Sequence, residues 1–235
     1  MEYISSDTNV WIDIERRIGM KKALSLLLML VMILTFTGCG ESGKEDPIEV
    51  QKTEYQAMEV DGVNEVYIDP MPKSLSDIVD HIDTDDPVNV CAFFMAGLVR
   101  ASESWEDGLE IMDEVCASKS PFHDNITEGM PEKDTHKQWL KESERNYIPR
   151  SYYKGSTPEN GYTPDSPWTL VLTKDEAQTT DYNITAANGY KYVVYDIQSS
   201  GRDTSRQLVL FQRPGETRWY MNSFSGILTT IQPPK

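Results

Sequence analysis

The spacing of apolar residues changes along this chain from a helical period to alternation, and that change restricts the fold more than any other feature. Before Trp168 apolar residues recur at intervals of three and four, which indicates helices. From Trp168 onward they alternate with polar residues, which indicates strands. The expected strands are residues 169–174, 181–187, 190–198, 206–213, 218–224 and 226–231.

Two turn signals indicate how these strands pair. Asn188-Gly189 lies between two of them, and both positions of a tight hairpin turn favour a positive φ. The sequence RPGET, between Gln212 and Arg218, predicts a second and longer hairpin. Since hairpins join antiparallel neighbours, we expect an antiparallel sheet of about five or six strands.

Helices are expected ahead of this sheet. Residues 87–102 are apolar nearly all round, as in a buried helix, and Asp86 before Pro87 supplies an N-cap with proline at the first helical position. Residues 104–119 carry apolar side chains on one helical face, so the two segments predict a helical hairpin. A short helix with a capping box at Ser74–Asp77 should precede it. The predicted class is α+β, with N-terminal helices followed by the sheet.

Cys91 and Cys116 leave two interpretations open. They are equidistant from the turn of the predicted helical hairpin, and an exported domain permits oxidation, so a disulfide between them is one hypothesis. The other is a pair of small buried hydrophobic residues. Neither suits catalysis, because apolar or acidic surroundings raise a thiol pKa.

Cys39 indicates where the protein resides. Lys21 and Lys22 precede an apolar run, Ala23–Thr37, that is too short to span a bilayer, and the run ends in the sequence FTGC. This segment resembles the signal of a bacterial lipoprotein, with lipid attached to Cys39 and the product held on the extracytoplasmic face of the cell membrane. We therefore expect a start site called too early (1–19), a signal peptide (20–38), a flexible tether (39–61) and one domain (62–235).

The net charge of −16 restricts the partners. Four basic and four acidic residues precede Cys39, so the exported part keeps the whole charge. Such a surface repels nucleic acid, which excludes it as an expected partner. No motif for a metal ion or a cofactor stands out, and His123 and His136 lack the spacing of a metal site.

Three further segments carry a family resemblance. They are DPVNVCAFFMAGLVR, YIPRSYYKGSTPENGYTPDSPWTL and SSGRDTSRQLVLFQRPGETRWYMNSFSGILTTIQPP. From about Pro72 to Pro233 their order and spacing resemble a family of small secreted or lipid-anchored bacterial proteins with a domain of unknown function. The resemblance implies one intact domain and assigns no catalytic residue. Arg202 and Asn222 depart from the family pattern, so a site near them would differ here.

Basic and aromatic residues gather in two loops of this acidic chain, and they form the candidate ligand site: Arg150, Tyr153, Lys154, Arg202 and Arg206. Arginine with tyrosine suits a carboxylate, a phosphate or a glycan. The alternative is that the tyrosines, glycines and prolines of these loops only pack a long connection.

No catalytic motif is evident, so a non-catalytic binding or accessory role with an unknown envelope ligand is the expected function. Two alternatives stay open. One is an envelope hydrolase of glycan or peptide without a recognisable motif, and the other is a structural envelope protein that acts through protein contacts.

Overall fold

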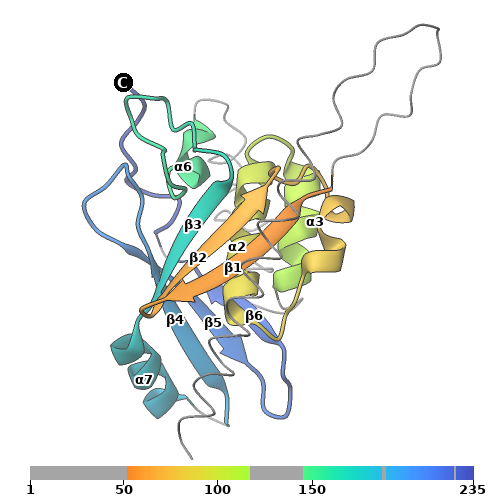
Figure 1. Ribbon diagram of the computed structural model, residues 1–235. Helices are drawn as coiled ribbons and strands as arrows, with labels where there is room; N and C mark the ends of the chain where they lie inside the picture. The colour runs from red at the N-terminus through yellow and green to blue at the C-terminus, as the bar shows by residue number, and fades with distance from the viewer. Residues whose placement is uncertain (1–51, 117–144, 187–188, 225) are drawn as a thin grey trace, which may run out of the picture. The chain divides into compact units, whose positions relative to one another are not determined.

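The computed structural model describes residues 52–116, 145–186, 189–224 and 226–235 (Figure 1). Cys39, the signal, most of the tether and Asn188 lie outside these residues. None of the helices in the described ranges is long and apolar enough to cross a membrane.

Six antiparallel strands form one sheet in which chain order is also spatial order. The predicted α+β class and antiparallel sheet are confirmed. The strands are β1 (Glu54–Val60), β2 (Val63–Asp69), β3 (Trp168–Lys174), β4 (Lys191–Ile197), β5 (Arg206–Gln212) and β6 (Trp219–Ser223). The RPGET segment joins β5 to β6, as expected.

The first hairpin, β1–β2, was not expected, because residues 54–61 had been interpreted as tether. Strand β1 is exposed along nearly its whole length and has no apolar alternation, since it forms the edge of the sheet. Asp61 and Gly62 have φ values of 53° and 79° and connect the paired residues Val60 and Val63. The sheet therefore begins before the helices, and the predicted order of helices first is wrong.

Two of the predicted strands, residues 181–187 and 226–231, are absent from the described structure. Residues 181–187 were expected to be extended, but helix α7 (Glu176–Thr185) covers most of them, and it begins where the Asp175 side chain accepts a hydrogen bond from the Gln178 amide at 2.9 Å. Residues 226–231 form turns. Their buried apolar residues are Ile227, Leu228 and Ile231, a spacing that a strand with one buried face cannot produce.

Helix α2 (Pro87–Ala101) is almost entirely buried, and α3 (Trp105–Val115) packs against it. A Cβ at Gly97 would meet the Met112 side chain, and one at Gly108 would meet Ala101, so these pairs mark the closest approach of the two helices. Both pairs are centred in sequence between residues 104 and 105. The disulfide hypothesis assumed a turn centred one residue earlier, between 103 and 104. Cys91 and Cys116 are both free and buried in the structure. Burial raises both thiol pKa values well above normal.

Shorter helical turns complete the described structure. The segment expected as one short helix forms two 3-10 turns, η1 (Leu75–Asp77) and η2 (Val79–His81). At the start of η1 the Ser74 amide donates to the Asp77 carboxylate at 3.0 Å. Helix α6 (Tyr147–Arg150) leads into the long connection before β3.

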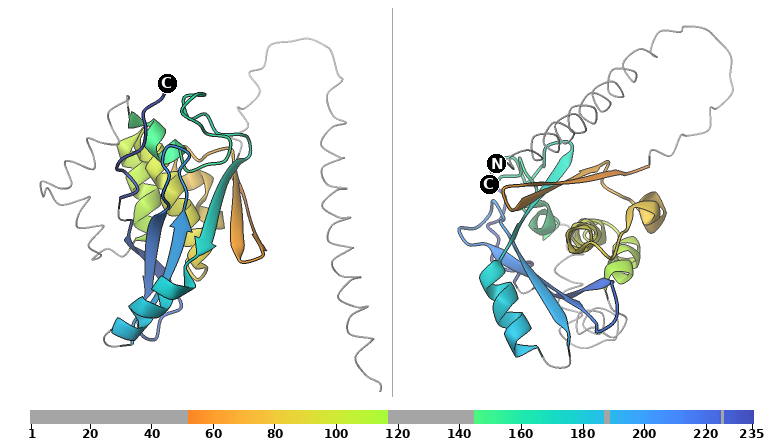
Figure 2. Two further views of the ribbon diagram at one scale, coloured as in Figure 1. Left: turned by 90° about the vertical axis from the view of Figure 1, so that its left-hand side faces the viewer. Right: turned by 60° about the horizontal axis from the view of Figure 1, so that its bottom comes forward.

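The shortest strand pairing in the sheet is that between β3 and β4, which pair only over Leu172–Lys174 and Tyr195–Ile197. Nearer the start of β4, side chains of α7 form hydrogen bonds with the backbone of β4 in place of β3. Thr179 Oγ1 accepts from the Val194 amide at 3.0 Å, and the Asn183 side chain both accepts from and donates to the Tyr192 backbone at 2.8 Å. The sheet thus diverges into two sections, β1–β3 and β4–β6, with α2 and α3 in the angle between them (Figure 2).

Candidate functional site

The structure brings together the two basic loops that the sequence singled out. The Ser200 amide donates to the Ser151 carbonyl at 3.0 Å, and the Ser199 and Ser151 hydroxyls are 2.7 Å apart. Within these loops Arg150 contacts Glu103 at 2.6 Å and Lys154 contacts Glu65 at 2.5 Å. Lys154 and the Tyr67 hydroxyl, as hydrogen-bond donors, lower the pKa of Glu65. Both basic side chains are therefore paired with carboxylates of the same domain.

Arg202 and Arg206 hold the final turns of the chain. Arg202 donates to Thr230 Oγ1 at 2.9 Å, and Arg206 donates to the same oxygen at 3.2 Å and to the Gly226 carbonyl at 3.0 Å. Thr230 has a φ of 57°, so these contacts fix a left-handed backbone position. The guanidinium groups act here as internal cross-links.

The two tyrosines of the first basic loop, Tyr152 and Tyr153, are packing residues. Tyr153 is buried against Trp168, with ring centroids 5.1 Å apart, and its hydroxyl has no hydrogen-bond partner in the described chain. Tyr152 donates to the Ile227 carbonyl at 2.8 Å. Burial raises the pKa of Tyr152, and the charges of Arg202 and Arg206 oppose that rise. These contacts agree with the alternative given for the two basic loops, in which their residues pack a long connection and do not bind a ligand.

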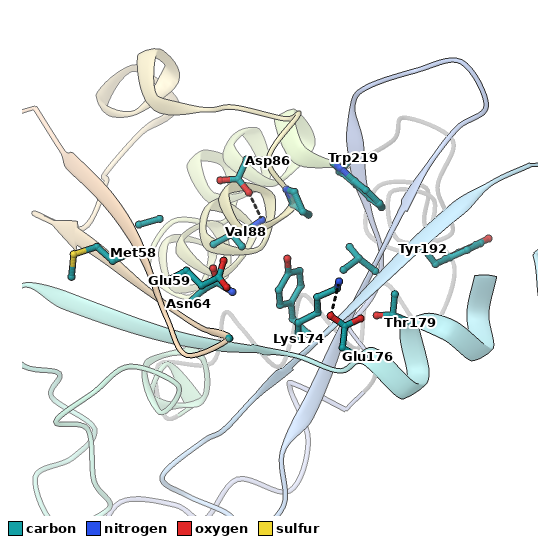
Figure 3. Close-up of a pocket in the computed structure, with 15 residues that line it drawn as sticks. Met58, Glu59, Asn64, Asp86, Val88, Lys174, Glu176, Thr179, Tyr192 and Trp219 are labelled. Carbon is teal, nitrogen blue, oxygen red and sulfur yellow. Dashed lines mark hydrogen bonds and ion pairs between the residues drawn. The ribbon is translucent and has the colours of Figure 1, made fainter. Parts of the chain in front are cut away.

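A pocket of about 750 Å³ opens elsewhere, at the point where the two sections of the sheet diverge (Figure 3). Its walls come from the β1–β2 hairpin, the start of α2, the end of β3, the first turns of α7, strand β4 and the first residue of β6. The lining residues are Ala57, Met58, Glu59, Gly62, Asn64, Asp86, Pro87, Val88, Lys174, Glu176, Thr179, Tyr192, Val193, Tyr195 and Trp219.

The pleat of the strands decides which of these side chains face the pocket. Tyr55 packs on Phe93 of α2, so Ala57 and Glu59, two and four residues further along β1, share its inward face. Met58 lies on the opposite face, and Figure 3 shows it pointing away from the pocket. Tyr192 points away as well.

Acidic groups dominate the inward-facing charges. Asp86 accepts from the Val88 amide at 2.9 Å and so caps α2, while Lys174 contacts Glu176 at 2.8 Å. Glu59 adds a further carboxylate, and within the described ranges it forms no ion pair. Three carboxylates against one ammonium leave the lining with an excess of negative charge.

Tyr195 contributes its side chain to this lining. The residue is only 4% exposed, and in the described part of the chain its hydroxyl has no hydrogen-bond partner. Burial raises its pKa, and the carboxylates of Asp86, Glu59 and Glu176 are among the charges that raise it further. The phenol therefore stays neutral and can both donate and accept a hydrogen bond.

The lining combines acidic, apolar and aromatic side chains. It contains no serine, cysteine or histidine, and the described residues hold no group of three side chains that could bind a metal ion. Acidic groups, apolar side chains and a tryptophan are what a binding site for a small molecule needs to orient a ligand.

A family model for a domain of unknown function, DUF6935, matches residues 70–235. The chain belongs to the DUF6935 family. This confirms the predicted resemblance to a domain of unknown function. Neither the curated proteins nor the solved structures contain a match to the chain. The β1–β2 hairpin precedes the matched range, so the DUF6935 domain supplies most of the pocket and the hairpin adds one wall.

Sequence reasoning missed this pocket for two reasons. Its residues come from seven elements between positions 57 and 219, and no local motif connects them. The wall formed by β1 had been interpreted as tether. Asp61-Gly62 was the available signal, because this dipeptide favours a two-residue hairpin turn.

Proposed function

We propose that this DUF6935 protein is a lipoprotein of the bacterial envelope whose domain binds a small ligand in the pocket between the two sections of the sheet. The anchor rests on the sequence before and at Cys39. The binding role rests on one observation, which is the pocket itself.

The pocket has properties expected of a ligand site. Its volume of about 750 Å³ falls within the roughly 300–1,000 Å³ typical of sites for small molecules. Val88, Val193 and Trp219 offer apolar contact, while Glu59, Asn64 and Tyr195 offer polar groups. Strands and capped helices position these side chains, and a site on such elements needs little reorganisation on binding.

The anchor can be tested by metabolic labelling with an alkyne analogue of palmitate. The wild-type chain should incorporate the label, and Cys39→Ser should not, because only the thiol can carry the lipid. A double Cys91→Ala, Cys116→Ala variant is the control, since both residues are buried in the domain and should not affect labelling. Equal labelling of wild type and Cys39→Ser would contradict the anchor.

The pocket can be blocked by Ala57→Trp, because this exposed residue of β1 faces inward and an indole there would occupy the space. Met58→Trp is the matched control on the outward face of the same strand. Thermal unfolding would be measured with neutral sugars, amino sugars, dipeptides, diamines and dicarboxylates. A ligand at about 100 times its Kd should stabilise the parent by about 2.7 kcal/mol, or roughly 5–10 °C in Tm.

That shift should persist in Met58→Trp and disappear in Ala57→Trp. If every compound that stabilises the parent also stabilises Ala57→Trp to the same extent, ligands bind elsewhere and the assignment of the pocket is wrong.

A further inference from the structure

We infer that the pocket selects an organic cation, a primary ammonium or guanidinium group carried on an apolar stem. The inference rests on the proposed binding function and names the ligand class for the same site. It follows from the charges that face the pocket, the tyrosine hydroxyl in its wall and the apolar surface beside them.

The charge of the lining disfavours an anion. The amino-terminal end of α2 would attract one, but Asp86 already occupies that end by accepting from the Val88 amide at 2.9 Å. Glu59 and Glu176 add two more carboxylates, and the ammonium of Lys174 is engaged with Glu176 at 2.8 Å. An anionic ligand would therefore meet a net negative lining without a free cation to receive it.

Tyr195 is the second and independent observation. Its side chain lines the pocket, is almost completely buried and has no hydrogen-bond partner in the described ranges. A neutral phenol can accept a hydrogen bond from an ammonium while its own proton points to a carboxylate. A cationic donor can therefore bond a pocket-lining hydroxyl that makes no hydrogen bond to the described residues.

The remaining walls fit the stem of such a ligand. Trp219 can contact a cation through the face of its ring, and Val88 and Val193 provide apolar surface. The pocket is much larger than a metal ion requires, and the described residues hold no cluster of three metal ligands. An alkyl chain with a terminal charge matches both the space and the chemistry.

The test is calorimetric titration of the full-length chain in detergent at low salt with three probes of similar length. These are 1,5-diaminopentane, pentane-1,5-diol and glutarate, which carry positive, zero and negative charge. Trilysine is a fourth probe that separates a peptide side chain from a free amine. We expect the diamine to bind at least tenfold more tightly than the diol and glutarate to bind least, with an affinity that falls as salt rises.

Charge variants should move the diamine affinity in opposite directions. Glu59→Gln should weaken it about fivefold, and the addition of Asp86→Asn should weaken it further, since asparagine keeps the helix cap but removes the charge. Lys174→Gln should strengthen it about threefold by releasing Glu176. Glu54→Gln, at the outward-facing start of β1 and outside the pocket, is the matched control and should leave it unchanged.

Three outcomes would overturn the inference. They are tighter binding of the diol or glutarate than of the diamine, an unchanged diamine affinity in Glu59→Gln, and no binding of either cationic probe. Binding of a neutral or anionic probe that Ala57→Trp abolishes would leave the proposed binding function standing while the cation selectivity fails. Binding of every probe unaffected by Ala57→Trp would remove both.

Discussion

Gly108→Ala is expected to lower the free energy of unfolding by about 3 kcal/mol, although alanine is normally the better helix former by about 1 kcal/mol. Gly108 lies within α3, where that helix touches α2. An added Cβ would lie 2.6 Å from the Cβ of Ala101 and closer still to its backbone. Backbone atoms cannot move aside as a side chain can, so the two helices would have to separate and lose packing.

Two matched variants make this prediction specific, with urea denaturation as the measurement. Gly97→Ala should cost less, about 1 kcal/mol, because its new Cβ would meet the Cγ of Met112 at 2.5 Å and that side chain can rotate. Glu110→Ala, on the exposed side of α3, should change stability little. If Gly108→Ala is as stable as the parent, the helices do not approach as closely as the structure has them.

Sequence patterns predicted the sheet where one face is buried and failed where burial is absent. Strands β4 and β5 are rich in apolar residues because they contribute to the hydrophobic core, so both strands are visible in the sequence. Strand β1 is exposed on most of its length, and Tyr55 is its one residue that packs against the main core cluster, so its sequence shows no apolar alternation. Only the turn at Asp61-Gly62 could have revealed it, since a two-residue turn with both φ values positive depends on local chemistry alone.

Helix α7 shows a different limit. Its residues have no apolar face and none is buried, so no helical period could be detected and residues 181–187 were wrongly predicted as a strand. The helix is held by Asp175 at its start and by hydrogen bonds that backbone amides of β4 donate to Thr179 and Asn183. These two residues are four apart and therefore face the same side, a pattern that has meaning only when the strand beside them is known.

The candidate site illustrates the limit most clearly. The basic loops attracted attention because cations are rare in this chain, yet Arg202 and Arg206 are held by the turns near Thr230. The charge pattern identified a real cluster of basic residues. It could not show whether these residues bind a ligand or form hydrogen bonds within the domain. The acidic lining of the pocket was invisible for the opposite reason, because acidic residues are common throughout the chain and Glu59 resembles any exposed glutamate.

Tyr162→Ala is expected to cost about 4 kcal/mol, because it removes a fully buried ring. The ring stacks on Tyr147 with centroids 5.4 Å apart, and its hydroxyl donates to the Gln232 carbonyl at 2.6 Å. It therefore connects the long loop before β3 to the final residues of the chain. Tyr162→Phe keeps the ring and loses only the hydrogen bond, so it should cost about 1 kcal/mol.

The backbone at Tyr162 adds a test that packing alone would not predict. Its φ of 57° is left-handed, a conformation in which glycine has no steric penalty. Tyr162→Gly should therefore be at least as stable as Tyr162→Ala in urea denaturation, the reverse of the usual order. If alanine is clearly better than glycine here, the left-handed turn is absent. Because this corner lies at the opposite end of β3 from α7 (Figure 1), Tyr162→Phe should leave the ligand-induced Tm shift of the pocket intact.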